Sequence, residues 1–419
     1  MKVLFTNNTL RWRAGSELYT LDLARRLLAR GHRPIAFSTS LGPVAEELRR
    51  ATIPVVDDLA KLSEPPDIIH AQHHFEAMIA LLHFPGVPAL FVCHGWLPWE
   101  ETPLLFPRIA RYVAVDDTTL DRLELEAGIP ADRIERFLSF VDLDRFRPRP
   151  PLPERPARAL VFSNQAREDG FLPAVREACS RRGIALDVAG LAAGRVIDRP
   201  EEVLPAYDLV FAKARCALEA LAVGNAVVLC DHTGSGPLVT SAGLDRLRPL
   251  NFGIRTLREP LSPEALGREI DRYDPADAAR VSARIREEAG LDASVDRYLD
   301  LYARILAEHQ GRPSSPLEES RAAAAYVRWL DVQVKQCHDL AQERDHLASE
   351  LDSVGSERER LESERDHLVS KLAQLASDND RLRAELAQIT GSASWRWRER
   401  LMGMKSVRRL YRWLRQLDG

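Results

Sequence analysis

Cysteine and lysine are both scarce in this chain of 419 residues. The five cysteines lie far apart and form no Cys-x-x-Cys pair, which argues against a zinc knuckle, a redox dithiol and a secreted disulfide framework. No apolar run reaches the roughly 18 residues that span a membrane, and the N-terminal run is too short for a signal peptide. A formal net charge of -4 is small for this length, so the chain as a whole is not built to coat nucleic acid. These absences predict a cytoplasmic protein, either soluble or peripheral on the inner face of the membrane.

Short apolar runs alternate with segments of helical periodicity through most of the chain. The expected strands are 2–5, 34–38, 67–71, 89–94 and 112–116 in the first part, and 158–164, 184–190, 207–214, 225–231 and 252–257 in the second. Strands separated by helices are typical of βαβ units and a parallel sheet. We therefore expect an α/β fold with two Rossmann-like domains, residues 1–146 and 158–310.

A proline-rich stretch separates these two domains. Residues 145–159 hold five prolines, which fix φ and remove backbone donors, so neither a helix nor a central strand continues through them. We interpret 147–157 as the interdomain linker. Two open sheets joined in this way predict a ligand cleft between the domains, lined by strand ends and helix N-termini.

Residues 208–236, "DLVFAKARCALEALAVGNAVVLCDHTGSG", carry the clearest chemical signal. Lys213, one of only six lysines, and Arg215 fall in a strand-to-helix turn, where free backbone N–H groups and two cations favour phosphate. The helix ends with Gly224 at a C′ position. Glu219 lies one turn into the helix, where a carboxylate is well placed to accept hydrogen bonds from sugar hydroxyls. A turn at Gly234, Ser235 and Gly236 would let the backbone approach a diphosphate. Alternatively, the two cations cap a neighbouring helix or pair with Asp208, and the glycines form an ordinary turn.

The same stretch resembles the donor-binding segment of retaining glycosyltransferases of the GT-B fold, family four. "EALAVG" matches the family pattern, with Glu219 as its second glutamate, but Phe211 stands where the family has the first. The family's Arg and Lys after the first strand of the second domain are also replaced, by "VFSNQARED" with Asn164. Our hypothesis is that Lys213 and Arg215 supply the displaced charge.

The N-terminal half strengthens this resemblance. "RAGSELYT" is similar to the family's GGAE loop, which implies that Gly15 and Ser16 approach the donor phosphates. "ALFVCHGW" resembles the family strand whose histidine reaches the donor sugar, here His94, with a buried structural histidine as the alternative. His70, His73 and His74 have weak spacing for a metal site, and the resemblance implies neither metal nor other cofactor.

The resemblance covers about residues 1–309 and implies a nucleotide-sugar donor on the second domain and an acceptor on the first. His94, Lys213 and Arg215 are the expected catalytic residues, because fixed cations stabilise the departing nucleotide diphosphate. The implied activity is a retaining, hexosyltransferase-type transfer to a glycan or lipid-linked acceptor in bacterial surface polysaccharide synthesis. The missing first glutamate keeps open a catalytically inactive GT-B binding module that acts as a scaffold.

Residues 317–390 have the heptad pattern of a coiled coil. Apolar residues recur every seventh position without a break, at 340, 347, 354, 361, 368, 375, 382 and 389. A stripe of this length needs burial, so we expect a homo-oligomer. The alternative is a solvated single helix.

Residues 391–419 form a basic tail with an apolar stripe. Between Trp395 and Arg415 there are seven arginines and one lysine, and Glu399 is the single acidic residue. This composition favours binding to an anionic membrane surface. "SASWR" also resembles the ending of many bacterial polysaccharide glycosyltransferases. Docking on an acidic protein and packing at the end of the coil are the alternatives, whereas no stacking platform for nucleic acid is present.

Overall fold

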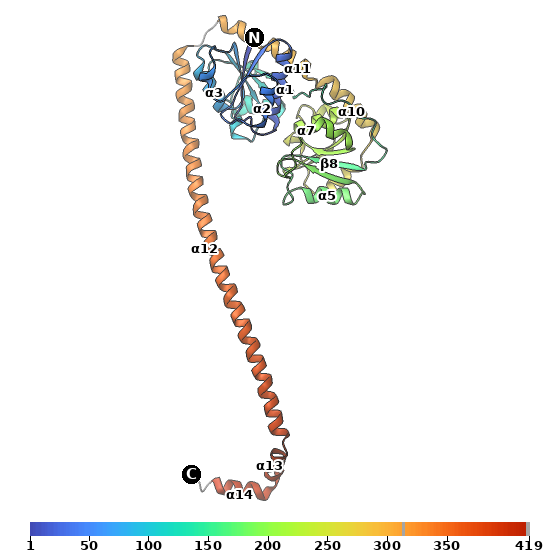
Figure 1. The fold of residues 1–419 in the computed structure, drawn as a ribbon, viewed down its shortest axis with the longest axis vertical. Helices are drawn as coiled ribbons and strands as arrows, with labels where there is room; N and C mark the ends of the chain where they lie inside the picture. The colour runs from blue at the N-terminus through green and yellow to red at the C-terminus, as the bar shows by residue number, and fades with distance from the viewer. Residues whose placement is uncertain (312–314, 416–419) are drawn as a thin grey trace. The chain divides into compact units, whose positions relative to one another are not determined.

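The computed structural model describes residues 1–311 and 315–415. The chain divides into two compact units, Met1–Ala325 and Tyr326–Gly419. The first unit contains two separate β-sheets, each covered by helices (Figure 1). The expected α/β class with two Rossmann-like sheets is confirmed.

The first sheet has seven strands in the order β3-β2-β1-β4-β5-β6-β7, and every pair in it is parallel. Its strands are β1 (Lys2–Thr6), β2 (Arg33–Phe37), β3 (Val55–Val56), β4 (Ile68–Ala71), β5 (Ala89–Cys93), β6 (Ile109–Ala114) and β7 (Ile134–Arg136). The connecting helices are α1 (Gly15–Ala29), α2 (Pro43–Arg50), α3 (His74–His83) and the short α4 (Asp117–Asp121). The central strands are buried on both faces, which explains their continuous apolar sequences.

The second sheet has five strands in the order β12-β11-β10-β8-β9, and only β12 runs antiparallel. Its strands are β8 (Arg158–Phe162), β9 (Ala185–Ala189), β10 (Leu209–Ala212), β11 (Ala226–Asp231) and β12 (Gly234–Leu238). Its helices are α5 (Leu172–Ser180), α6 (Pro200–Val203), α7 (Ala214–Val223), α8 (Leu244–Leu247), α9 (Pro263–Ile270) and α10 (Pro275–Glu288). Helix α7 ends at Gly224 with φ 102°, as its predicted C′ position requires.

Two local predictions in the second domain are wrong. The expected strand 252–257 is instead a short 3₁₀ turn, Ile254–Thr256, which follows two residues with positive φ, Asn251 and Phe252. The expected glycine turn is the edge strand β12, because these residues pair antiparallel with β11. Ser235 also exchanges backbone hydrogen bonds of 2.9 Å with Glu259 on the open side of β12. Residues 147–157, all of them described, contain neither helix nor strand.

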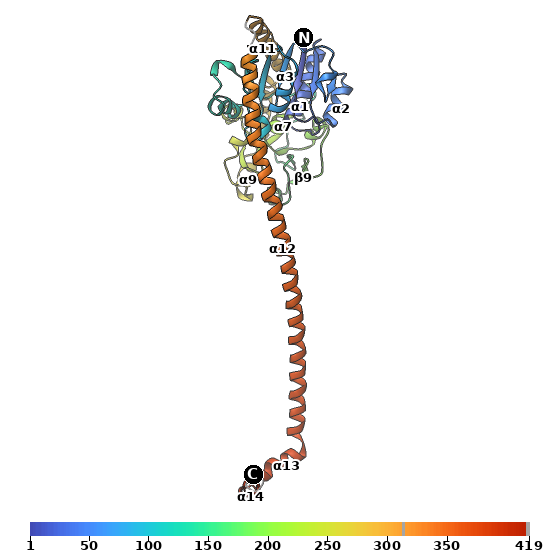
Figure 2. The same ribbon diagram turned by 90° about the vertical axis from the view of Figure 1, so that its left-hand side faces the viewer.

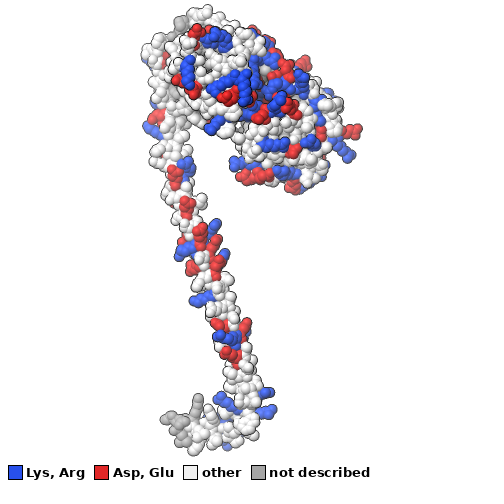
Figure 3. All heavy atoms as spheres, viewed as in Figure 1, with Lys and Arg blue, Asp and Glu red and all other residues white. Residues whose placement is uncertain are grey.

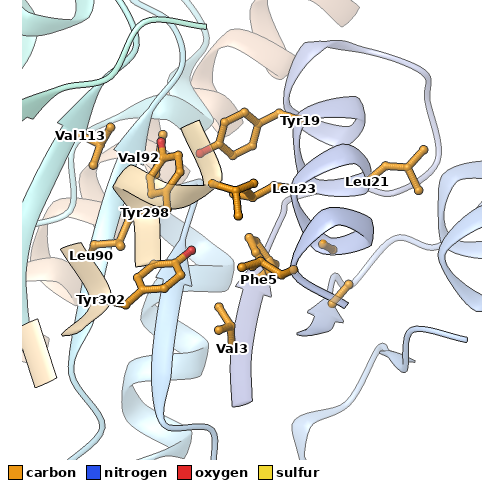
Figure 4. Packing of buried hydrophobic residues seen from close by; sticks show 14 of the residues in the cluster. Val3, Phe5, Tyr19, Leu21, Leu23, Leu90, Val92, Val113, Tyr298 and Tyr302 are labelled. Carbon is orange, nitrogen blue, oxygen red and sulfur yellow. The ribbon is translucent and has the colours of Figure 1, made fainter. Parts of the chain in front are cut away.

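Helix α11 (Leu291–Gly311) returns from the second domain and packs on the first sheet. Its buried Tyr298 and Tyr302 join Phe5, Leu90 and other apolar side chains of that sheet (Figure 4). The Tyr302 hydroxyl lies 2.6 Å from Nδ1 of the buried His70. The last 20 residues of the segment that sequence assigns to the second domain therefore complete the core of the first, because the apolar face of α11 covers the α1 side of the sheet.

The second unit consists mainly of helix α12 (Pro316–Gly391), whose first turns belong to the first unit, followed by α13 (Ala393–Gly403) and α14 (Lys405–Arg415). Helix α12 is one continuous helix (Figure 2) of 76 residues. None of its described side chains is buried. A helix both long and apolar enough to cross a bilayer does not occur within residues 1–311 and 315–415. The end of the predicted basic tail, residues 416–419, lies outside the described residues.

Candidate functional site

Three strand ends of the second sheet meet around a lysine and a buried aspartate. Ser163 follows β8, Lys213 follows β10, and Asp231 ends β11. Ser163 donates a 2.9 Å hydrogen bond to Asp231 Oδ1, and Lys213 forms an ion pair with Asp231 Oδ2. Burial would raise the pKa of Asp231, but the Lys213 charge and the hydrogen bonds to this carboxylate together outweigh burial and lower the pKa. The carboxyl edge of a parallel sheet is where such folds bind ligands, so this pair lies at the expected place.

Helix α7 begins directly at this edge. Lys213 is its N-cap residue with an extended backbone, and Ala214 has a φ of 48°, which is uncommon for a residue with a Cβ atom. Arg215 Nε donates to Glu219 Oε1 at 2.7 Å, four residues along the helix. Burial raises the pKa of Glu219, although Arg215 opposes that shift. The predicted cation pair and carboxylate are thus brought together at one helix terminus.

Arg215 also crosses to the first domain, where it pairs with Asp22 of α1. Asp22 is 1% exposed and accepts a second ion pair from Arg145 at 3.0 Å, and Arg145 in turn contacts Glu201 at 3.0 Å. Burial would lower the pKa of Arg215, but its two carboxylate partners outweigh burial and raise it. Asp22, Glu201 and Glu219 with the two arginines therefore form a network, named here the Asp22 cluster, that ties both domains together.

His94 lies at the carboxyl edge of the first sheet. Its Nε2 is 2.7 Å from Gln72 Oε1, and because that oxygen only accepts, Nε2 carries the proton. The ring packs edge-on against Tyr19 at 4.6 Å between centroids. Burial lowers the pKa of His94 to about 4, and Arg215 across the cleft adds to the lowering. His94 is therefore neutral near pH 7 and cannot act there as a cationic acid.

A buried acid–base cluster that the sequence did not reveal lies beside His94. His73 Nε2 is 3.2 Å from Glu101 Oε1, and the His94 backbone N–H donates to Glu101 Oε2 at 2.9 Å. Burial opposes protonation of His73, but the neighbouring carboxylates, Glu101 first, together outweigh burial and raise the pKa of His73. Burial also raises the pKa of Glu17, and the Glu17 carboxylate contributes to the raised pKa of His73.

The glycine loop of the first domain is open. Gly15 begins α1, and a Cβ added there would meet nothing within 4 Å. Ser16 donates to Glu17 Oε2 at 3.0 Å. Asn164 of the second domain donates to the backbone carbonyl of Arg13 at 3.4 Å, so it faces the same loop.

Gly234 and Gly236 are closed in rather than open. A Cβ on Gly236 would lie 2.6 Å from the Thr256 carbonyl oxygen, and one on Gly234 would lie 3.1 Å from two carbonyl oxygens. Ser235 Oγ donates to the Pro260 carbonyl at 3.1 Å. These three residues fit β12 against its neighbours, and Gly234 lies opposite Asp231 in the sheet register. Phe211, in place of the family glutamate, is fully buried in the core of the second domain.

The three clustered histidines diverge. His70 contacts Tyr302, His73 contacts Glu101, and the His74 ring packs on Trp99 at 4.8 Å. Within the part of the chain that the structure describes, no group of three or more His, Cys, Asp or Glu side chains could hold a metal ion.

A cavity of about 940 Å³ adjoins the Asp22 cluster. It is lined by the following residues: Arg13, Arg25, Gly42, Pro43, Glu46, Glu47, Arg50, Arg145, Asp198, Arg199 and Glu201. Arg145 belongs both to this cavity and to the Asp22 cluster. Charged groups from both domains thus surround a space large enough for a nucleotide-sized ligand.

Sequence reasoning missed Asp22, Asp231 and the His73–Glu101 pair. A signal existed for the first two, since Asp22 interrupts the apolar face of α1 and Asp231 ends the apolar run of β11. No local signal joins His73 to Glu101, because the contact depends on how the loop after β5 folds back.

The chain is similar to one family model and to several solved structures. A family model described as Glycosyltransferase Family 4 matches residues 13–145. A glycosyltransferase of Rickettsia africae is structurally similar with a TM-score of 0.54 and 17% identity, covering 73% of this chain and 98% of its own. Anabaena HepE in complex with UDP and glucose gives 0.52 and 15%, covering 72% and 99%, and its complex with UDP-glucose gives 0.50 and 15%, covering 73% and 100%. No curated protein is significantly similar. The fold of the first unit is GT-B.

Proposed function

We propose that this chain is a nucleotide-sugar-dependent glycosyltransferase. The observation that carries the proposal is the convergence of Lys213, Arg215 and Glu219 at the start of α7 with His94 and the open Gly15 loop of the first domain. The family match over residues 13–145 and the GT-B fold support it, and the structural relative HepE was crystallised with UDP-glucose.

The charged residues at the start of α7 have separate roles in this proposal. Lys213 and Arg215 bind the donor diphosphate and stabilise the negative charge that develops as it leaves. Asp231 holds Lys213 and Asp22 holds Arg215 in position before the donor arrives. The donor phosphate then replaces these two carboxylates as the partner of the cations. Glu219 accepts hydrogen bonds from sugar hydroxyls, and the neutral His94 reaches the sugar from the other domain.

The finer assignments of the reaction belong to the same proposal. The transfer retains anomeric configuration, needs no metal or other cofactor, and places a hexose on a glycan or lipid-linked acceptor in bacterial surface polysaccharide synthesis. The acceptor binds the first domain. Helices α13 and α14 rest on an anionic membrane surface, which the exposed Trp397, Trp413 and Leu414 and the surrounding arginines support.

Isothermal titration of the purified chain with UDP-, GDP- and ADP-sugars tests donor binding. We expect one nucleotide class to bind, and Gly15→Ala to weaken it by about tenfold because a new methyl group occupies the space of the phosphates. The fold should tolerate this change, since nothing lies within 4 Å of the added Cβ. The control Gly355→Ala, in helix α12 with nothing within 4 Å of the added Cβ, should leave binding unchanged. Absence of binding by any of the three classes at millimolar concentration would refute the proposal.

A catalytically inactive scaffold is the second candidate. The buried Phe211 removes the carboxylate that the family resemblance places on the donor sugar, and this specific observation favours it. The two candidates differ in turnover: a scaffold would bind the donor in the titration and release no nucleoside diphosphate in a coupled assay supplied with bacterial lipid-linked glycans, whereas the enzyme would release it.

A further inference from the structure

The exposed stripe of α12 has a defined heptad register. Eight apolar residues from Leu340 to Ile389 occupy one position, and each is at least half exposed in the single chain. If this position is d, the a positions four residues later are Arg344, Leu351, Arg358, Arg365, Leu372, Asn379 and Leu386, with Cys337 before them. The d layer is rich in leucine, and four of the seven a positions from 344 to 386 are polar. Polar residues at a positions specify register and oligomer state at a cost in stability.

From this register we propose that residues 337–389 of two copies form a parallel, in-register, two-stranded coiled coil. The proposal rests on the charges that flank the seam, not only on the apolar stripe. Figure 3 shows charges of both signs along α12, and their order along the heptad fits one arrangement better than the others.

The g positions, which immediately precede the a positions, are mostly acidic. They are Glu343, Glu350, Glu357, Glu364, Lys371, Asp378 and Glu385. Each a-position arginine, at 344, 358 and 365, therefore directly follows a glutamate. In a parallel in-register dimer an a side chain packs into a hole that includes the partner's preceding g residue. Every seam arginine then meets a glutamate of the second copy.

An antiparallel arrangement lacks this match. When the seams overlap fully, g residues face g residues, so Glu343 opposes Glu385 and Glu350 opposes Asp378. Only Glu357 and Lys371 form an opposite-charge pair. Each a residue would also share a layer with an apolar d residue, which leaves Asn379 and the arginines without polar partners.

Asn379 and the arginines also limit the number of strands. A buried asparagine at an a position pairs with its own copy in a parallel dimer and fixes the register. Arginine at an a position of a dimer extends its guanidinium to the solvent edge, whereas the a layer of a trimer is more enclosed and desolvates the charge. The seam thus specifies a dimer at some cost in stability.

Sedimentation equilibrium of the full chain tests the stoichiometry. We expect twice the chain mass of 47.1 kDa. Arg358→Glu should shift the equilibrium toward monomer, because it meets Glu357 of the second copy, and exchanging the pair in Glu357→Arg/Arg358→Glu should restore the dimer. Arg328→Glu, at an outer f position of the same helix, is the matched control and should change nothing. A monomer, a trimer or failure of the exchanged pair to rescue would overturn the proposal.

Disulfide cross-linking tests the orientation. Cys337 is exposed on α12, while the other four cysteines are buried or partly buried. Mild oxidation should link Cys337 to Cys337 of the second copy, and Cys337→Ser should abolish the covalent dimer. In a chain with Cys337→Ser and Ile389→Cys, oxidation should likewise join position 389 of one copy to position 389 of the second copy. A mixed disulfide between positions 337 and 389, formed when the two chains are refolded together, would show an antiparallel coil. Because neither measurement uses activity, its outcome is independent of the proposed function.

Discussion

At the scale of single residues, the interdomain site is a set of charges that neutralise one another. Asp22 is almost fully buried and accepts two arginines from different segments, Arg145 and Arg215. Removing one member of a buried ion pair leaves an uncompensated charge, which costs more than the pair itself contributes. The residues of this network therefore affect stability as well as ligand binding.

Asp22→Asn should destabilise the first unit by about 3 kcal/mol, because two arginines then lack their shared carboxylate. The measurement is the free energy of unfolding from urea titration followed by tryptophan fluorescence. Asp144→Asn, which removes a carboxylate that is 76% exposed and pairs with Arg26, is the control and should cost under about 1 kcal/mol. Equal losses in the two variants would contradict the network.

His94 gives the protein a defined response to acid. Its pKa is about 4 in the folded chain, below the value near 6.5 expected when it is unfolded. Between these values the unfolded chain binds the extra proton, so stability falls as the pH falls from about 6.5 to about 4. His94→Gln should flatten this slope by at most about 1.4 kcal/mol per pH unit. Urea titrations at several pH values measure it, with His338→Gln on the exposed face of α12 as the control; an unchanged slope in His94→Gln would contradict the assignment.

At the scale of elements, the start of α7 combines three requirements. The strand must end, the helix must begin, and Lys213 and Arg215 must point to different partners, Asp231 and Asp22. The backbone achieves this with a positive φ at Ala214 and a hydrogen bond of 2.9 Å from its N–H to the Phe252 carbonyl. Strain of this kind concentrates at functional sites.

Substitutions at Ala214 should reveal that strain. A left-handed conformation costs an L-residue about 1–2 kcal/mol, and glycine is free of this cost, so Ala214→Gly should leave the thermal midpoint unchanged or raise it. Ala214→Val should lower it, because a β-branched side chain tolerates positive φ poorly. At Ala220, inside α7, the effects on the thermal midpoint should differ, because glycine is clearly destabilising in a helix interior. A marked loss of stability in Ala214→Gly would refute the strain.

At the scale of the whole molecule, a parallel coiled coil would place the basic tails of two copies at the same end. Each tail then binds an anionic surface more effectively because the second binding step is intramolecular. The exposed aromatic and leucine side chains of α13 and α14 supply the apolar contact, and their arginines supply the charge.

Co-sedimentation with vesicles tests this combination. The full chain should bind phosphatidylglycerol vesicles, and binding should weaken with salt. Arg358→Glu, with the tail intact, should reduce the apparent affinity by about tenfold or more, and the chain ending at residue 391 should not bind. Phosphatidylcholine vesicles are the control. Equal binding to both lipids would contradict an electrostatic surface contact.

The two-domain α/β fold and the long helix follow from sequence pattern alone. Buried parallel strands must be continuously apolar, and the seven-residue repeat of 340–389 must place one side chain type on one helix face, so these features are local and periodic. The same holds for the strand-to-helix turn at Lys213 and Arg215 and for the C′ glycine at 224.

Only the tertiary structure decided which partners those residues meet. The contacts of Arg215 with Asp22, His73 with Glu101 and Tyr302 with His70 join residues 28 to 232 positions apart, and no local pattern encodes such pairs. Glu259 likewise meets Ser235 at the open edge of the strand Gly234–Leu238. Sequence determined the elements because periodicity acts over neighbouring residues, whereas packing between distant segments determined the site.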